Sequence, residues 1–199
     1  MPRTKAFDED TALHSAMQLF WKQGYHATSM QQLLDATGLS RSSLYETFGG
    51  KEALFLAAIE RYLNEINRVR VQAMLNDPSP RCGIEAFFSG IVEFAVGDAK
   101  KLGCMMTNSA IEFGSGKGPI EDRIFGVFKA VEEAFVTTVE RGQQLGEIPH
   151  RQTPRELARF LMTQVQGVRV MSRVNPERDW LQSAVSVALC VIRKSEKAA

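Results

Sequence analysis

Apolar residues recur at helical spacing along almost the whole chain of 199 residues. Leu13, Met17 and Phe20 share one helix face, and Leu54 and Ala58 share another. No segment alternates convincingly between apolar and polar residues at the two-residue period of a half-buried strand. The pattern therefore predicts an all-α fold of about nine helices.

Glycines, prolines and capping residues divide this pattern into separate helices. Ser29 and Gln32 form a capping-box pattern, and Gly24 and Gly38 suit helix ends because glycine adopts the left-handed conformation at little cost. The two prolines of "NDPSPR" end a long helix, since proline has no backbone donor. The predicted helices span residues 8–23, 29–37, 40–48, 51–76, 81–97, 103–113, 119–145, 154–173 and 176–194.

Composition excludes several classes of protein. Hydrophobic residues make up 44% and charged residues 24% of the chain, as in ordinary globular proteins. The apolar run at 184–192 is far shorter than the roughly 20 residues of a membrane span, and no apolar stretch of a signal peptide follows the first basic residues. Cys82, Cys104 and Cys190 form no CxxC pair, and an odd number does not favour a disulfide framework. We expect a cytoplasmic protein without membrane association.

Net charge gives little support for a nucleic-acid partner. It is +1 for the whole chain, and the five basic and five acidic residues of positions 1–51 cancel. Binding to DNA would therefore depend on where individual charges lie rather than on bulk attraction.

The segment "GLSRSSLYETFGGKEALF", residues 38–55, carries the most specific chemistry. Leu44 and Phe48 fall about 40° apart on a helical wheel and form an apolar seam with Leu39. Small side chains let a helix approach base edges, arginine can bridge guanine O6 and N7, and a tyrosine hydroxyl suits a phosphate. A solvated surface helix is the alternative interpretation. The polar side carries Arg41, Ser42, Ser43, Tyr45 and Glu46.

The surrounding residues resemble a known family. Ala16, Phe20 and "GYHATSMQQLLDATGLSRSSLYETFGGKEAL" resemble, without a gap, the N-terminal region of the TetR family of bacterial transcriptional regulators. The resemblance implies a helix-turn-helix DNA-binding domain over residues 1–50 and a ligand-binding and dimerisation domain over 51–199. It implies base contacts from residues 41–43 and phosphate contacts from Tyr45, Lys51, and Thr28 or Ser29. The implied DNA-binding set is Thr28, Ser29, Ser40, Arg41, Ser42, Ser43, Tyr45 and Lys51.

One position departs from the family pattern. Gly50 stands where the family often has a small polar residue, so we expect a looser joint between the third and fourth helices. The predicted phosphate contact of Lys51 has independent support, because the N-terminus of a helix presents free amides and a positive dipole to a phosphate.

The C-terminal part is rich in phenylalanine and methionine, most of which must form its core. The resemblance implies a cavity for a small-molecule inducer among the middle helices. We single out Phe94, Met106 and Phe128 as lining residues, with Asn108 and Glu112 orienting a polar group or pairing locally.

Cys104 follows Gly103 at a predicted helix start. The helix dipole and free amides there, with Lys100 and Lys101 upstream, would favour a reactive thiolate. The resemblance to TetR regulators implies that this thiolate could be a redox sensor at the ligand site. Free cysteines are also among the most buried residues, so an inert buried thiol is the alternative.

The last two predicted helices have broad apolar faces that need a partner. The resemblance implies a four-helix interface in a homodimer, and two-fold symmetry then implies a palindromic operator in double-stranded DNA. The interface residues would be Phe160, Leu161, Val165, Trp180, Ala184, Val187 and Val191.

Two other functions compete with a regulator. An enzyme is disfavoured because His14, His26 and His150 are scattered and no catalytic, metal-binding or cofactor motif is present. A helical carrier of small molecules would have no reason to keep the 28–52 signature. We therefore expect a repressor, without catalytic residues, metal or cofactor, that a small-molecule or thiol-reactive inducer releases from DNA.

Overall fold

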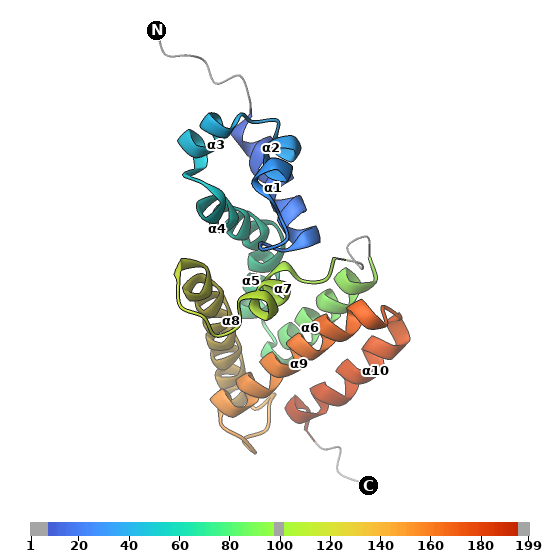
Figure 1. Ribbon diagram of the computed structural model, residues 1–199. Helices are drawn as coiled ribbons and strands as arrows, with labels where there is room; N and C mark the ends of the chain where they lie inside the picture. The colour runs from blue at the N-terminus through green and yellow to red at the C-terminus, as the bar shows by residue number, and fades with distance from the viewer. Residues whose placement is uncertain (1–7, 98–101, 195–199) are drawn as a thin grey trace. The chain divides into compact units, whose positions relative to one another are not determined.

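Every regular element in the described part of the chain is a helix, so the predicted all-α fold is confirmed. The computed structural model describes residues 8–97 and 102–194 (Figure 1). α4 (Lys51–Tyr62), a π-helical segment (Leu63–Asn67) and α5 (Arg68–Asn76) follow one another without a break, so the described residues form nine helical stretches.

Each of the nine helical stretches begins and ends within two residues of its predicted bounds, when the final 3₁₀ turn is counted with the last helix. This agreement shows that local capping and periodicity decide the helices. In chain order they are α1 (Glu9–Gln23), α2 (Met30–Thr37), α3 (Arg41–Phe48), α4 (Lys51–Tyr62), the π-helical segment (Leu63–Asn67), α5 (Arg68–Asn76), α6 (Pro80–Val96), α7 (Met105–Phe113), α8 (Pro119–Gln144), α9 (Pro154–Val174), α10 (Arg178–Leu189) and a final 3₁₀ turn (Cys190–Ile192).

Capping residues account for several of these bounds. The Ser29 hydroxyl accepts a hydrogen bond from the Gln32 N–H at 3.2 Å, and Gln32 Oε1 accepts one from the Ser29 N–H at 2.8 Å. Thr153 and Glu156 form the same reciprocal pair at the start of α9. Gly38 ends α2 at φ 69°, a conformation that glycine adopts readily.

The chain divides by contacts into two compact units. The N-terminal unit contains the described residues up to Asn67 together with Asn108–Ile124. The C-terminal unit contains the described residues of Arg68–Thr107 and those from Phe125 onward. The domain boundary at residue 50 follows the helix-turn-helix signature rather than contacts, and it stays a prediction.

The core of the N-terminal unit consists of side chains that α1 to α4 direct toward one another. Phe20, Leu33, Leu44 and Phe55, one from each helix, are at most 1% exposed. The rings of Phe20 and Phe55 meet edge to face with centroids 4.9 Å apart. Leu44 is the buried residue of α3, so this helix is held from one side.

The core of the C-terminal unit joins α6, α8, α9 and α10. Phe88, Phe135, Leu161 and Leu181, one from each of these helices, are fully buried. Leu157 and Val165 extend the same cluster along α9. Over residues 8–97 and 102–194, no helix combines the length and apolarity needed to cross a membrane.

Candidate nucleic-acid interface

Helix α3 is anchored by one leucine and exposes most of its other side chains. Leu44 is fully buried, whereas Tyr45 is 50% exposed and Arg41 and Ser42 face solvent. Phe48, which the sequence placed in the buried seam, is only half-buried. The Arg41 guanidinium makes no ion pair with the described residues. The outward side therefore offers a guanidinium, hydroxyls and a phenol to a partner.

The serines before and in the first turn of α3 form a small hydroxyl cluster. Ser40 Oγ accepts a hydrogen bond from the Ser43 N–H at 3.1 Å and so caps the helix. The same hydroxyl lies 3.0 Å from Ser42 Oγ and 2.8 Å from Ser43 Oγ. Ser40 thus has a structural role, and exposed Ser42 is the best placed of the three for a base.

The joint between α3 and α4 is packed rather than loose. Gly50 adopts φ 124° and ψ −173°, a region that side chains rarely occupy. A Cβ on Gly50 would lie 3.2 Å from Cε1 of Tyr45. The looser joint expected from the two glycines is therefore wrong, because the missing side chain makes room for the tyrosine ring.

Thr28 and Ser29 lie in different environments although they are neighbours. Thr28 is fully buried, and its hydroxyl donates to the Gly24 carbonyl at 2.6 Å. Ser29 is exposed at the start of α2. Of the two residues predicted to meet a phosphate, only Ser29 faces solvent.

Lys51 opens α4 with its ammonium against an aromatic ring. Nζ lies 4.3 Å from the centroid of the Tyr25 ring, a cation–π distance. Burial lowers the pKa of Lys51, and the carboxylate of Glu112 acts in the opposite direction. Gly50 gives α4 no side-chain cap, so the first amides of α4 are left for another acceptor.

Two family models match most of the chain. The model described as bacterial regulatory proteins of the tetR family matches residues 12–58, which contain all of α2 and α3. The model described as the tetracyclin repressor-like C-terminal domain matches residues 80–188. The chain belongs to the TetR family of transcriptional regulators. Because this family is not enzymatic, the protein is a helix-turn-helix regulator rather than an enzyme.

Related TetR regulators match over nearly their whole length. The HTH-type transcriptional repressor ComR of Escherichia coli (strain K12) is 30% identical over 188 residues, which are 94% of this chain and 90% of ComR. YezE, an uncharacterized regulator of Bacillus subtilis (strain 168), is 32% identical over 197 residues, which are 96% of this chain and 100% of YezE.

Solved TetR structures share the fold. A cysteine mutant of the regulator CifR, complexed with 26-base-pair operator DNA, has a TM-score of 0.85 and 29% identity. That similarity covers 96% of this chain and 99% of CifR. A TetR regulator from Chloroflexus aurantiacus has a TM-score of 0.81 and 26% identity, with 92% of each chain covered.

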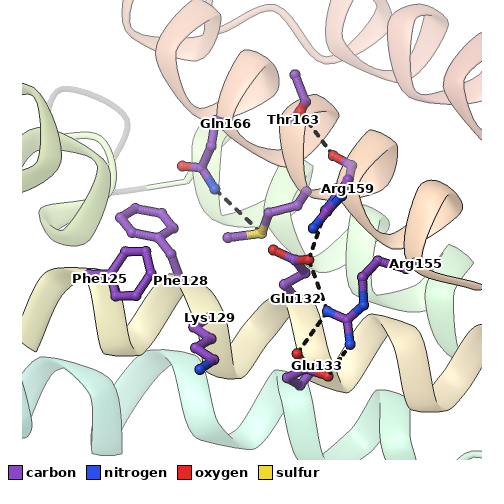
Figure 2. A pocket seen from close by; sticks show the side chains of 10 residues that line it. Phe125, Phe128, Lys129, Glu132, Glu133, Arg155, Arg159, Thr163 and Gln166 are labelled. Atoms are coloured by element: carbon purple, nitrogen blue, oxygen red, sulfur yellow. Dashed lines mark hydrogen bonds and ion pairs between the residues drawn. The ribbon is translucent and has the colours of Figure 1, made fainter.

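The C-terminal unit contains a cavity of about 450 Å³ between α8 and α9. Figure 2 shows Phe125 and Phe128 on α8 at one end, and Arg155 and Arg159 with Glu132 and Glu133 at the other. Arg155 donates to Glu133 at 2.8 and 2.9 Å and to Glu132 at 3.2 Å. The site combines apolar surface with a fixed charged network. Its other lining residues are Lys129, Met162, Thr163 and Gln166.

The predicted ligand residues do not gather at this cavity. Phe128 is among its lining residues, and the other five are not. Phe94 is half-buried with the Arg70 guanidinium 4.9 Å from its ring centroid, and Met106 is buried in α7. Asn108 lies on α7 and is half-buried. The sequence missed the charged lining because Arg155 and Glu133 are 22 positions apart.

Cys104 directly precedes α7, where the sequence placed it, and is 5% exposed. Its thiol is therefore shielded from bulk solvent, and its reactivity stays a prediction. Lys100 and Lys101, which were expected to favour the thiolate, lie outside the described residues. Both oxygens of Glu112, predicted to face a ligand, accept hydrogen bonds from backbone N–H groups of the N-terminal unit.

The predicted dimer residues separate into two groups. Phe160, Trp180, Ala184 and Val187 are exposed, with Val187 at 72%, and Val191 is half-buried. Leu161 and Val165 are fully buried in the core of their own unit, so they are not on an open surface. The exposed apolar face of α9 also includes Val170, Met171 and Val174.

Among residues 8–97 and 102–194, no three His, Cys, Asp or Glu side chains are placed so that they could hold a metal ion.

Proposed function

We propose that this protein is a homodimeric repressor that binds a palindromic operator and leaves it when an inducer reaches the C-terminal unit. The main support is the outward side of α3, which exposes Arg41, Ser42 and Tyr45 while Leu44 is fully buried. A helix held in this way can enter a major groove without losing its own packing. ComR, one of the related regulators, is a named repressor, which favours repression over activation.

Each exposed group on this side has a distinct role toward DNA. Arg41 would read a guanine through O6 and N7, and Ser42 would contact the neighbouring base edge. Tyr45, Ser29 and Lys51 would bind backbone phosphates, which position the helix but carry no sequence information.

Dimerisation would use the exposed apolar stripe of α9 and α10. On α10 the apolar residues Trp180, Ala184 and Val187 recur at helical spacing, and a stripe of this kind is typical of a helix packed against another helix. Two-fold symmetry would present two copies of α3 to successive major grooves and so select a palindrome.

The inducer would be an organic molecule or a thiol-reactive compound. The cavity between α8 and α9 is about 450 Å³, which lies in the usual range for a small-molecule site. Cys104 would supply the thiol that reacts with an electrophile or oxidant. The related regulator CifR was crystallised as a cysteine mutant.

A gel-shift assay with the purified protein on the intergenic DNA upstream of its own gene tests the function. We expect a specific complex whose affinity falls with rising salt, because phosphate contacts release counterions. A small-molecule carrier or an enzyme would give no specific shift at any salt concentration.

Two substitutions separate base readout from phosphate contact. Arg41→Ala should change which operator variants are preferred, with a loss of about 1–3 kcal/mol at the base pair that Arg41 reads. Tyr45→Phe should weaken binding to all sequences to a similar degree. Equal losses on every sequence for both variants would contradict these roles.

The thiol is tested with Cys104→Ser. If Cys104 is the sensor, the wild-type complex dissociates on treatment with hypochlorite, a quinone or an aldehyde, whereas the variant complex stays intact. Cys82→Ser is the matched control, because Cys82 is exposed and lies on α6. Unchanged release from the Cys104→Ser protein would remove this thiol from the mechanism.

A further inference from the structure

Glu112 of α7 holds the turn that follows α1. Its Oε2 accepts a hydrogen bond from the Tyr25 N–H at 2.9 Å, and its Oε1 accepts one from the His26 N–H at 2.5 Å. The partners lie 86 and 87 positions away in the chain, but all belong to the N-terminal unit. Hydrogen bonds to an ionised carboxylate are stronger than neutral ones. One side chain thus fixes two consecutive peptide groups.

Gly24 makes room for this carboxylate. It follows α1 at φ 83°, and a Cβ there would lie 2.8 Å from Glu112 Oε2. A side chain at residue 24 would therefore displace the carboxylate as well as strain the backbone. The glycine that the sequence explains as a helix end is also required by the approach of Glu112.

The held turn leads directly into α2. Thr28 donates its hydroxyl to the Gly24 carbonyl at 2.6 Å and its backbone N–H to the Tyr25 carbonyl at 3.2 Å. Ser29 follows and caps α2. A shift of the turn would therefore move the first residues of α2.

The same turn also positions a cation. The Tyr25 ring packs against Phe55 and Phe113, with centroids 5.0 and 5.4 Å away. Lys51 Nζ lies over this ring at 4.3 Å. Because the Glu112 carboxylate holds the Tyr25 peptide, it also sets where the Lys51 ammonium rests.

We propose that Glu112 is a positioning residue for DNA binding: it holds the turn at Gly24–His26 so that Ser29 and Lys51 can each meet a backbone phosphate. This role rests on the proposed function, since it concerns how the N-terminal unit is prepared for an operator. If only about a tenth of the molecules keep the turn in its binding conformation once the carboxylate is removed, operator affinity falls about tenfold.

Electrostatics alone predicts the opposite sign. Glu112 adds a negative charge close to Lys51, and removing a negative charge from a DNA-binding surface strengthens binding to phosphates. Weaker binding after removal of Glu112 therefore separates positioning from simple charge.

The experiment compares full-length Glu112→Ala, Glu112→Gln and Glu60→Gln with the wild type. The probe is a duplex that the wild-type protein enriches from a random-sequence library, and affinity is measured by fluorescence anisotropy over a salt series. Glu60→Gln is the matched control, because Glu60 also links α4 to residues 108–124, through an ion pair with Arg123, which lies outside the turn. Circular dichroism confirms folding, and Glu112→Gln carries the test if the alanine variant does not fold.

We expect Glu112→Ala to bind about tenfold more weakly at each salt concentration, with an unchanged salt slope because the bound complex keeps its phosphate contacts. Glu112→Gln, which keeps one acceptor oxygen, should fall between this variant and the wild type, and Glu60→Gln should match the wild type. Equal or tighter binding by Glu112→Ala, or equal losses in Glu60→Gln, would overturn the proposal. If the wild type enriches no duplex, the proposed function itself fails.

Discussion

Two arginines, Arg155 of the C-terminal unit and Arg41 of the N-terminal unit, serve different purposes. In the C-terminal unit Arg155 joins Glu132 and Glu133 across 23 and 22 positions of the chain, respectively. On α3 of the N-terminal unit, Arg41 has no such partner among the described residues. A paired guanidinium links helices of one chain, whereas an unpaired one is available to an outside acceptor. The comparison distinguishes a unit built for cohesion from a surface built for recognition.

The largest expected effect is on the anchoring of α3. Leu44→Ala removes a fully buried side chain and should lower the free energy of unfolding by about 2–5 kcal/mol. The outward side of α3 then loses its fixed position, so operator binding should be lost while the proposed dimer persists. Urea denaturation, gel shift and sedimentation measure the three quantities. If this variant bound the operator as tightly as the wild type does, recognition would not depend on the anchored helix, and the contrast between the two units would fail.

The second-largest effect is expected for Gly50→Ala. It forces a side chain into a conformation that costs about 1–3 kcal/mol and brings a Cβ against the Tyr45 ring. Operator affinity should fall with stability because the ring moves. Gly38→Ala is the control, since a Cβ there has open space although φ is also positive. Thermal melts measure the stability of both variants, and binding isotherms measure their operator affinity. Equal losses of operator affinity in the two variants would show that the contact between Gly50 and the Tyr45 ring does not matter for binding.

A smaller effect is expected for the paired arginine. Arg155→Ala should lower the free energy of unfolding only slightly, because the ion pairs with Glu132 and Glu133 are largely open to solvent. Arg41→Ala should leave stability unchanged and alter DNA preference instead. Urea denaturation of both variants measures the two stabilities. A stability loss in Arg41→Ala but not in Arg155→Ala would contradict the roles assigned to the two arginines.

The smallest expected effect concerns pH. A hydrogen bond from the Ser79 hydroxyl lowers the pKa of Glu147 below its ordinary value of 4.5, and an Arg81 N–H contributes. A lowered pKa in the folded state means that the stabilisation is complete above pH 4.5 and is lost as pH falls through the lower value. Glu147→Gln should therefore flatten the pH dependence of the unfolding midpoint between pH 7 and 3. Parallel curves for variant and wild type would contradict this expectation.

Local signals predicted the helices and the polar side of α3 well. Ser29, Ser40 and Thr153 cap the helices that follow them, and Leu44 anchors its helix. These features depend on residues three or four positions apart, which a single sequence displays.

Burial of individual residues was predicted less well. Thr28 was one of two residues expected to meet a phosphate, and Leu161 was expected to face a second subunit, but both are fully buried. A helix face can be read from periodicity, whereas the part of that face that a neighbouring helix covers depends on how the helices pack.

The sequence by itself determined an all-α regulator with one short helix whose polar side is turned outward. Only the tertiary structure decided that Glu112 holds the turn after α1, that the Tyr45 ring rests on Gly50, and that Arg155 is bound to two glutamates. The physical reason is range. Capping and periodicity act within a single helical turn, whereas the partner of Glu112 lies 87 positions away and is selected by the packing of whole helices.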